Sequence, residues 1–562
     1  MSGLGFELLP ACLSPSAHGG YFLTALKALV ASFLRPDTCV NSNFSRSSGV
    51  VLAVIFAAVS LLHWPLLRLP YFWDEAGYYI PAARDLLLTG SVIPHSTPSN
   101  AHPPLVMAYL AAWWKMVEYS PRVTRGAMVL VSAFVLLGVF RLARWVSNCE
   151  VAVAATACTA LYPVFFAQST MAHVDLAAAG LTIWGLDSYL GKRWRAAAWW
   201  FSLAVLAKET ALLAPLALLA WEWVCPWAGR VLKSQLCFHE RGRRLAVSLL
   251  TPVAVLSLWY GYHYWRTGYV FGNPDFFRYN VQATMNPLRI MLALGMRIWQ
   301  ALGYMHLWVL TLLMGWAMTR PAVCDGDIER RRIDLPVQFT FGVLILAYVA
   351  AMAVVGGAVL ARYMLTVVPL VVILAVSTLQ RRIRRWPVLI VLVCIAFGAA
   401  LFLNPPYGFS PEDNLAYRDY IVMHEDAESF LEARYPSARV LTAWPASDEI
   451  SRPYLGYVTH PLRVVRVEDF TAEEVIAAAQ ERGRFDVALI FSTKYEPVRS
   501  LLGHWHTWEK LKTRFFGFHR DLPPTIAAQL LGGRVVFSET SLGQWVAVIE
   551  LEHVVDASLR RP

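Results

Sequence analysis

The sequence has 562 residues, of which 57% are hydrophobic and only 16% are charged, with a mean hydropathy of +0.45. Soluble domains carry about 25% charged residues, so this composition excludes an ordinary soluble protein and indicates a membrane protein. The net charge of +10 comes from the part before residue 404, because 404–562 contains 17 basic and 22 acidic residues. This uneven placement is typical of membrane topology, so no nucleic-acid partner is expected.

The first 48 residues precede the first long apolar block. Their short apolar stretch is interrupted by Lys27, and no small-residue cleavage site follows it. We therefore expect residues 1–48 to be a partly disordered cytoplasmic leader rather than a secretory signal.

Long apolar blocks then recur up to residue 403, each near the length of about 20 residues that crosses about 30 Å of hydrocarbon. The blocks are 50–67, 126–142, 151–166, 176–190, 196–224, 245–264, 291–316, 337–353, 364–379 and 387–403. They predict a transmembrane domain over residues 49–403.

Positively charged loops between these blocks set the predicted topology, because short loops rich in lysine and arginine prefer the cytoplasm. The five basic loops are 141–144, 192–195, 230–244, 320–332 and 381–385. All five are cytoplasmic if 104–117 lies at the interface and if 196–224 forms two short helices that turn at Lys208. A continuous helix would bury Lys208 near the bilayer centre, at a cost of about 2.5–3.5 kcal/mol. The prediction is a polytopic α-helical protein of about eleven spans, with the C-terminal part outside the cytoplasm.

Ionisable and aromatic residues gather on the outward face of this topology. They are Asp74 and Glu75 after the first span, His102 before two prolines, His173, Asp175, Lys208 with Glu209, Arg278, and Arg362 with Tyr363. Each has an ordinary alternative, since carboxylates cap helices and long basic side chains reach toward lipid headgroups. Their convergence on one face predicts a binding site for a charged headgroup.

The order of these motifs resembles a known family. The chain has Asp-Glu after the first span, His-Pro-Pro-Leu, an aspartate after the third span, a lysine after an apolar run and a late Arg-Tyr. This order is similar to that of the dolichyl-phosphate-mannose protein O-mannosyltransferase superfamily. That superfamily has the GT-C fold and includes the lipid A aminoarabinose transferase. The resemblance covers about residues 50–403.

The resemblance implies a membrane glycosyltransferase that moves a hexosyl or pentosyl group from a polyprenyl-phosphate carrier to a hydroxyl of a protein, lipid or glycan. Asp74 is the implied general base of an inverting displacement, with Glu75 beside it in the catalytic motif. His102, Lys208 and Arg362 occupy the implied phosphate-binding positions. Glu75 and Asp175 match acidic positions of the same cavity, and the outward-facing His173, Arg278 and Tyr363 complete the predicted substrate site.

Neither a metal nor a cofactor is expected. The aminoarabinose branch reads Glu-Lys-Pro-Pro where this chain has Ala101-His102-Pro103-Pro104, which removes a possible metal ligand. The expected location is a bacterial inner membrane, with the site and the C-terminal part on the non-cytoplasmic side.

Residues 404–562 alternate helical and strand patterns and predict a separate α/β domain. The predicted helices are 427–434 and 471–483, and the predicted strands are 439–443, 462–467, 486–491, 534–539 and 545–551. This domain carries no phosphate-binding loop, so we interpret it as an acceptor-binding or structural lid.

Two other functions stay open at this point. A transporter or flippase of lipid-linked sugars would place charged groups in broken helices near the bilayer midplane and would show internal repeats, and no repeat is visible. A membrane sensor or scaffold would use the α/β domain as its ligand module, but it would leave the residues from Asp74 to Arg362 without a role.

Overall fold

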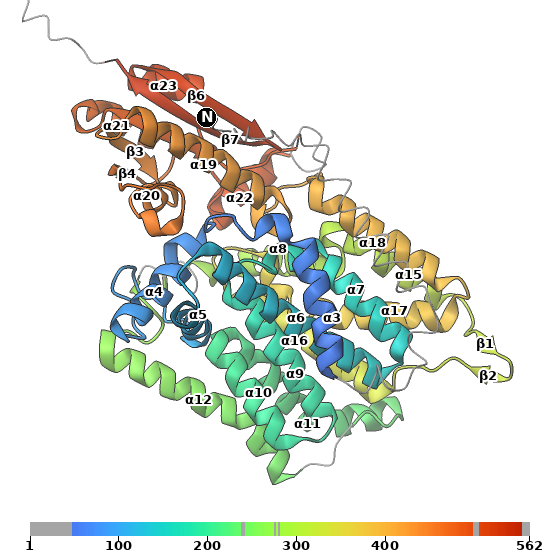
Figure 1. Cartoon of the computed structure of the whole chain (residues 1–562). Coiled ribbons are helices and arrows are strands. Elements are labelled where there is room, and N and C mark those ends of the chain that lie inside the picture. The colour runs from blue at the N-terminus through green and yellow to red at the C-terminus, as the bar shows by residue number, and fades with distance from the viewer. Residues whose placement is uncertain (1–47, 238–241, 275–276, 279–281, 498–504, 553–562) are drawn as a thin grey trace, which may run out of the picture.

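The computed structural model describes residues 48–237, 242–274, 277–278, 282–497 and 505–552. The predicted leader lies outside the described residues, except for its last position. The described chain forms a bundle of helices with a sheet domain packed on one end (Figure 1). We call that end of the bundle the domain-side end.

The bundle consists mainly of apolar helices whose outer surfaces carry exposed large side chains. Leu258, Leu346 and Val388 on three different helices are 76%, 68% and 64% exposed. Exposed apolar surface of this extent is typical of contact with lipid. The helices are α3 (Ser48–Leu62), α6 (Pro121–Val146), α7 (Cys149–Leu161), α9 (Val174–Leu190), α10 (Trp194–Ala207), α11 (Leu213–Leu232), α12 (Arg243–Thr267), α14 (Pro287–Leu302), α15 (Leu307–Met318), α16 (Leu335–Val354), α17 (Val368–Arg382) and α18 (Trp386–Phe402).

Five helical segments of the described chain are long and apolar enough to cross a membrane. They are Pro121–Val146, Glu209–Leu232, Arg243–Thr267, Pro287–Met318 and Leu335–Val354. The helices α3, α7 and α18 are apolar but shorter. The protein is therefore an integral membrane protein, while the total of eleven spans and the orientation stay predictions.

One predicted break between helices is present in the structure, and one segment predicted as a single helix is divided. The predicted turn at Lys208 is confirmed, because α10 ends at Ala207 and Lys208 has extended backbone angles of φ −153° and ψ 132°. The block 291–316, predicted as one helix, is instead divided into α14 and α15. Met305 and His306 have φ values of +46° and +65°, in the left-handed region, which a right-handed helix cannot continue through.

Short helices cover the domain-side end. They are η1 (Trp64–Leu66), η2 (Glu75–Tyr79), α4 (Ile80–Thr89), α5 (Leu105–Met116), α8 (Pro163–Gln168), η3 (Glu209–Leu212), η4 (Gln282–Thr284), η5 (Tyr304–His306), η6 (Ala361–Met364) and η7 (Pro411–Asp413). The helix α5 has 12 residues and packs against α4 and α6. Its length of about 18 Å is too short to cross the hydrocarbon layer, in agreement with the interfacial placement predicted for 104–117.

The sheet domain has five strands in the order β4-β3-β5-β7-β6. They are β3 (Arg439–Ala443), β4 (Arg463–Val467), β5 (Val487–Ser492), β6 (Gly533–Ser541) and β7 (Gln544–Leu551), so each predicted strand is confirmed. The strands β4, β3 and β5 are parallel, whereas β7 and β6 are antiparallel to their neighbours. All six residues of the central β5 are buried, as expected for a strand covered on both faces.

The helices of the sheet domain are α19 (Ala416–Arg434), α20 (Ala446–Glu449), α21 (Ala472–Gln480), α22 (His506–Phe516) and α23 (Pro524–Leu531), with short turns η8 (Pro453–Leu455) and η9 (Arg482–Arg484). A two-stranded ribbon, β1 (Cys324–Asp325) with β2 (Ile328–Glu329), lies between α15 and α16 at the other end of the bundle (Figure 1).

The sheet domain is tied to the loop that follows the first apolar helix. The Tyr457 hydroxyl donates a hydrogen bond of 3.1 Å to the backbone oxygen of Tyr71. Gly77 of η2 lies so close to Trp444 that a Cβ atom on the glycine would be 2.6 Å from the indole ring. The missing side chain at Gly77 therefore lets the domain pack directly on the segment that contains Asp74.

Candidate active site

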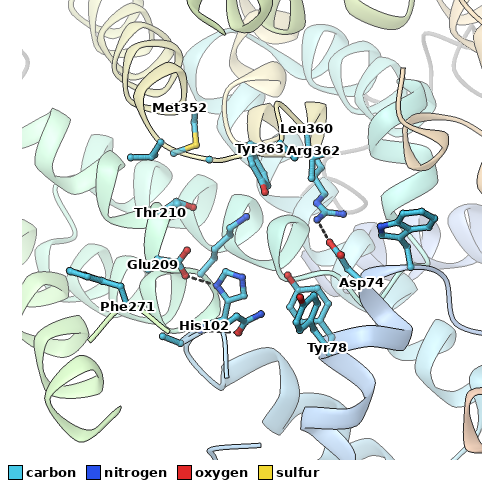
Figure 2. A pocket seen from close by; sticks show the side chains of 18 of the residues that line it. Asp74, Tyr78, His102, Glu209, Thr210, Phe271, Met352, Leu360, Arg362 and Tyr363 are labelled. Atoms are coloured by element: carbon cyan, nitrogen blue, oxygen red, sulfur yellow. Dashed lines mark hydrogen bonds and ion pairs between the residues drawn. The ribbon is translucent and has the colours of Figure 1, made fainter. Parts of the chain in front are cut away.

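A cavity of about 1080 Å³ lies at the domain-side end of the bundle, between the membrane helices and the sheet domain. Its lining has an apolar part, which includes Leu213, Leu216, Leu256, Phe271, Met352 and Val355, and a polar part, which includes Asp74, His102, Lys208, Glu209, Arg362 and Glu412. In Figure 2, Phe271 lies at one side of the pocket and the Asp74–Arg362 pair at the other. A lining that is mainly apolar with a few converging polar groups is the usual form of a ligand site.

Unusual backbone geometry directs two of the polar side chains toward the cavity. Trp73 and Ala101 have φ values of +44° and +58°, and they directly precede Asp74 and His102. Asp74 directly precedes a short π-helical turn, η2. Left-handed angles at residues other than glycine cost about 1–3 kcal/mol and cluster at functional sites, as do π-helical turns.

Arg362 is the centre of the polar side. Its guanidinium is 3% exposed and forms ion pairs with Asp74 and Glu412, and its Nε lies 3.3 Å from Oδ2 of Asp175. These three carboxylates come from the segment after α3, from η7 and from the first turn of α9. One buried cation therefore joins segments that are distant in the sequence.

Lys208 lies next to this cluster. Its Nζ is 2.5 Å from Oδ1 of Asp175 and 4.0 Å from the centre of the Tyr363 ring. Lys208, Arg362 and Tyr363 all line the cavity. Since Asp175 contacts both cations, it fixes their spacing at the cavity wall.

His102 and Glu209 form a second pair at the cavity wall, with 2.8 Å between Nδ1 and Oε2 (Figure 2). Both residues line the cavity. The pairing brings the segment before α5 against the break between α10 and α11.

His173 lies behind the cavity wall and is fully buried. Its Nδ1 is 2.7 Å from Oε1 of Gln168 and 3.3 Å from Nη1 of Arg362. Burial and then the charge of Arg362 lower the pKa of His173 well below its ordinary value, so the ring is neutral. A neutral imidazole in this position supports Arg362 without competing with it for an anion.

Glu75 does not lie in the cavity, where its predicted catalytic role would place it. It is 0% exposed and does not line the cavity. Its two oxygens accept hydrogen bonds of 3.2 and 3.1 Å from the buried Arg125, and the backbone N–H groups of Phe72 and Ala172 donate to it at 2.9 and 2.6 Å. These four hydrogen bonds fix the segment that contains Asp74.

Arg278 is also apart from the other predicted residues. Its side chain is exposed. The neighbouring Phe277 lines the cavity, whereas Arg278 is not among the described residues of the lining. The structure therefore brings together Asp74, His102, Asp175, Lys208, Arg362 and Tyr363, places His173 directly behind Arg362, and leaves Glu75 and Arg278 outside the cavity.

Glu412 was missed by the sequence analysis, although it lines the cavity and pairs with Arg362. Burial raises the pKa of the Glu412 carboxyl to about 8, because the loss of water outweighs the opposing effect of a guanidinium that is shared by three carboxylates. Burial also raises the pKa of its neighbour Asp413 to about 7. The sequence signal for this site residue was the acidic pair Glu412-Asp413 in the segment that follows the last apolar block.

The comparisons with known proteins agree with this architecture. No protein-family model and no curated protein matches the chain. The structure is similar to a crystal structure of ArnT from Cupriavidus metallidurans bound to undecaprenyl phosphate, with 14% identity and a TM-score of 0.51 over 88% of this chain and 97% of that chain. The apo state of the same protein gives 14% identity and a TM-score of 0.50 over 89% of this chain and 98% of that chain. The chain therefore has the fold of the aminoarabinose transferase ArnT, a membrane glycosyltransferase of the GT-C type, and the resemblance predicted from the sequence motifs is confirmed for the fold.

Proposed function

We propose that this protein is a glycosyltransferase that moves a sugar from a polyprenyl-phosphate carrier to a hydroxyl group of a protein, lipid or glycan. The observation that carries the proposal is one cavity whose lining combines apolar side chains with the polar side chains of Lys208, Arg362 and Asp74. The similarity to ArnT, whose structure holds undecaprenyl phosphate, supports a donor of the same class.

The donor fits the two sides of the cavity by its chemistry. An isoprenoid chain is apolar and would lie against Leu216, Leu256 and Met352 on the side that adjoins the membrane helices. The phosphate is an anion that needs cations and hydrogen-bond donors, which Lys208 and Arg362 supply. His102 also lines the cavity, with its Nδ1 2.8 Å from Oε2 of Glu209.

In the proposed reaction Asp74 is the general base. The acceptor oxygen forms a bond to the anomeric carbon, the bond from that carbon to the phosphate oxygen breaks, and its electron pair leaves with the phosphate. The acceptor proton moves to Asp74, and the configuration at the anomeric carbon is inverted. The products are the glycosylated acceptor and polyprenyl phosphate, whose charge Lys208 and Arg362 stabilise.

The ion pair between Asp74 and Arg362 suits a base that is used only when the donor is present. A bound phosphate competes with the carboxylates for the Arg362 guanidinium. Each contact that Arg362 makes to the phosphate weakens its hold on Asp74, so the carboxylate is free to contact the acceptor hydroxyl. Donor binding would therefore prepare Asp74 to accept the proton.

Glu412 is the other carboxylate at the same cation, and its pKa separates the two roles. With a pKa of about 8, Glu412 is largely protonated at neutral pH, so only a minor fraction of the molecules can accept a proton on it. We assign the base to Asp74, which occupies the motif position that the resemblance gives to the base, and Glu412 to a supporting contact with Arg362.

The test is a transfer assay with the purified full chain. Radiolabelled polyprenyl-phosphate sugars are incubated with the protein and a membrane extract, and labelled products are separated from the donor. A labelled acceptor that is formed by the native protein and is absent with Asp74→Asn supports the proposal. Transport of the intact lipid-linked sugar across proteoliposomes, without any labelled acceptor, would instead support the transporter alternative.

A further inference from the structure

A second cluster of potential ligands lies in the sheet domain, away from the cavity lining. His424 and Glu428 are one helical turn apart on α19, and Glu449 is the last residue of α20. Each offers one ligand atom, and these three atoms lie within 4.8 Å of one another. The Nδ1 atom of His424 is 2.8 Å from Oε2 of Glu449 and 3.5 Å from Oε1 of Glu428.

All three side chains are removed from solvent, with exposed fractions of 1%, 0% and 0% for His424, Glu428 and Glu449. Both carboxylate oxygens of Glu428 have no hydrogen-bond partner. Among the described residues, no lysine or arginine forms an ion pair with either glutamate. Leaving a charged group buried without a partner costs several kcal/mol, so this arrangement calls for a ligand or for a change of charge.

We propose that His424, Glu428 and Glu449 bind a divalent transition-metal ion such as Zn²⁺ or Mn²⁺. This site is separate from the proposed glycosyltransferase site and does not depend on that proposal. One imidazole and two carboxylates form a donor set that suits these ions. Their two positive charges match the two carboxylates that have no lysine or arginine partner.

The distances agree with this class of ion. Zinc binds imidazole nitrogen and carboxylate oxygen at about 2.0–2.2 Å, which places tetrahedral ligand atoms about 3.4 Å apart. The separations of 2.8 and 3.5 Å at His424 lie on either side of this value. The Tyr420 hydroxyl donates to Glu449 at 3.2 Å, as outer partners of metal-binding carboxylates do.

The surroundings indicate what the metal does. The Tyr420 ring stacks on His424 with 3.8 Å between ring centres, and it packs against Phe72 and Trp73, at 5.2 and 5.9 Å. Trp73 directly precedes Asp74. The metal joins α19 to α20 and thereby fixes the part of the sheet domain that packs on the Asp74 segment, so its role is structural.

Without a metal the cluster has one other way to balance its charge. Burial and the neighbouring Glu449 raise the pKa of Glu428 well above its ordinary value, so a proton on Glu428 would take the place of the metal. These two states differ in metal content and in their response to a chelator, so they can be distinguished.

The experiment uses the full chain purified in detergent. Metal content is measured by inductively coupled plasma mass spectrometry, and EDTA-treated protein is then titrated with ZnCl₂ or MnCl₂ in a calorimeter. We expect one ion per chain in the native protein, and one ion fewer in Glu428→Gln and in Glu449→Gln. The matched control is Asp426→Asn, an exposed acidic residue on the same helix, which should keep the native stoichiometry.

Thermal unfolding gives a second readout. EDTA should lower the Tm of the native protein and of Asp426→Asn but leave that of Glu428→Gln unchanged. Tyr420→Phe keeps all three ligands, and it should weaken metal binding by about 10-fold, as losing an outer partner does. If a glutamine variant does not fold, titration of the EDTA-treated native protein decides the question. A native protein that binds neither ion, or equal stoichiometry in Glu428→Gln and Asp426→Asn, would overturn the proposal.

Discussion

Asp74 and Arg362 are 288 positions apart in the sequence and form an ion pair at the wall of the cavity. The aspartate follows the first apolar helix, whereas the arginine lies in η6 between α16 and α17. This pair connects the proposed base with a proposed phosphate ligand, so the two functions are expected to respond to each other. Figure 2 shows the pair beside Tyr78 and Tyr363.

Asp74→Asn should reduce sugar transfer by about 100-fold or more, because the amide keeps the shape of the side chain but cannot accept a proton. Donor binding should remain, since Lys208 and Arg362 are unchanged. Initial rates with a labelled donor and direct donor binding measure the two effects. Glu412→Gln is the matched control and should keep most of the transfer activity at neutral pH. A loss of activity in Glu412→Gln with native activity in Asp74→Asn would assign the base to Glu412.

Arg362→Lys should weaken donor affinity by about 10-fold, because lysine keeps the charge but loses the planar pair of donors that matches phosphate. The conservative change also leaves a cation beside Asp74, Asp175 and Glu412. Binding of a polyprenyl phosphate to the detergent-solubilised protein measures the effect. Arg266→Lys, at an exposed arginine of α12, is the control and should bind normally. Equal affinity in both variants would remove Arg362 from the phosphate site.

Glu75→Gln should destabilise the protein by about 3–5 kcal/mol, because it leaves the fully buried Arg125 without its carboxylate partner. Thermal unfolding in detergent measures this loss. Glu118→Gln, at an exposed glutamate, is the control and should unfold at the native temperature. A Glu75→Gln protein of native stability without transfer activity would restore the predicted catalytic role of Glu75.

The raised pKa of Glu412 predicts a pH dependence of stability. The carboxyl has an ordinary pKa near 4.5 in the unfolded chain and about 8 in the fold, so only the unfolded state loses its proton as the pH rises between these values. The stability that Glu412 contributes is therefore complete at low pH and declines by up to about 1.4 kcal/mol per pH unit until the pH passes about 8. Glu412→Gln should show a shallower decline of Tm over this range, whereas the exposed Glu468→Gln should follow the native protein. Identical slopes in the two variants would contradict the raised pKa.

The orientation can be tested with a native residue. Cys324 is exposed on the ribbon between α15 and α16, in a basic loop that is predicted to be cytoplasmic. In intact cells it should resist a membrane-impermeant maleimide and react after permeabilisation. Arg484→Cys, placed in the sheet domain of a chain without other cysteines, should react in intact cells. The opposite labelling pattern would place the sheet domain and the cavity in the cytoplasm.

The sequence by itself determined the membrane class, the break at Lys208 and the strands of the C-terminal sheet. These features depend on local properties: the length of an apolar block against the thickness of the hydrocarbon, the cost of a lysine within it, and the alternation of helix and strand patterns along 404–562. It also indicated that polar residues such as Asp74 and Arg362 face one end of the bundle, because the ends of helices follow from their lengths.

Only the tertiary structure decided which of these side chains meet. Asp74 and Glu75 are adjacent in the sequence, yet one carboxylate lines the cavity beside Arg362 and the other is buried against Arg125. Glu412 contacts the same arginine from η7, which follows α18, the last helix of the bundle. Local patterns fix where a helix begins and ends, but the rotation of each helix about its axis and the path of each loop depend on packing between segments that are distant in the chain. For that reason the partners of each carboxylate, and with them its protonation and its role, follow from the fold.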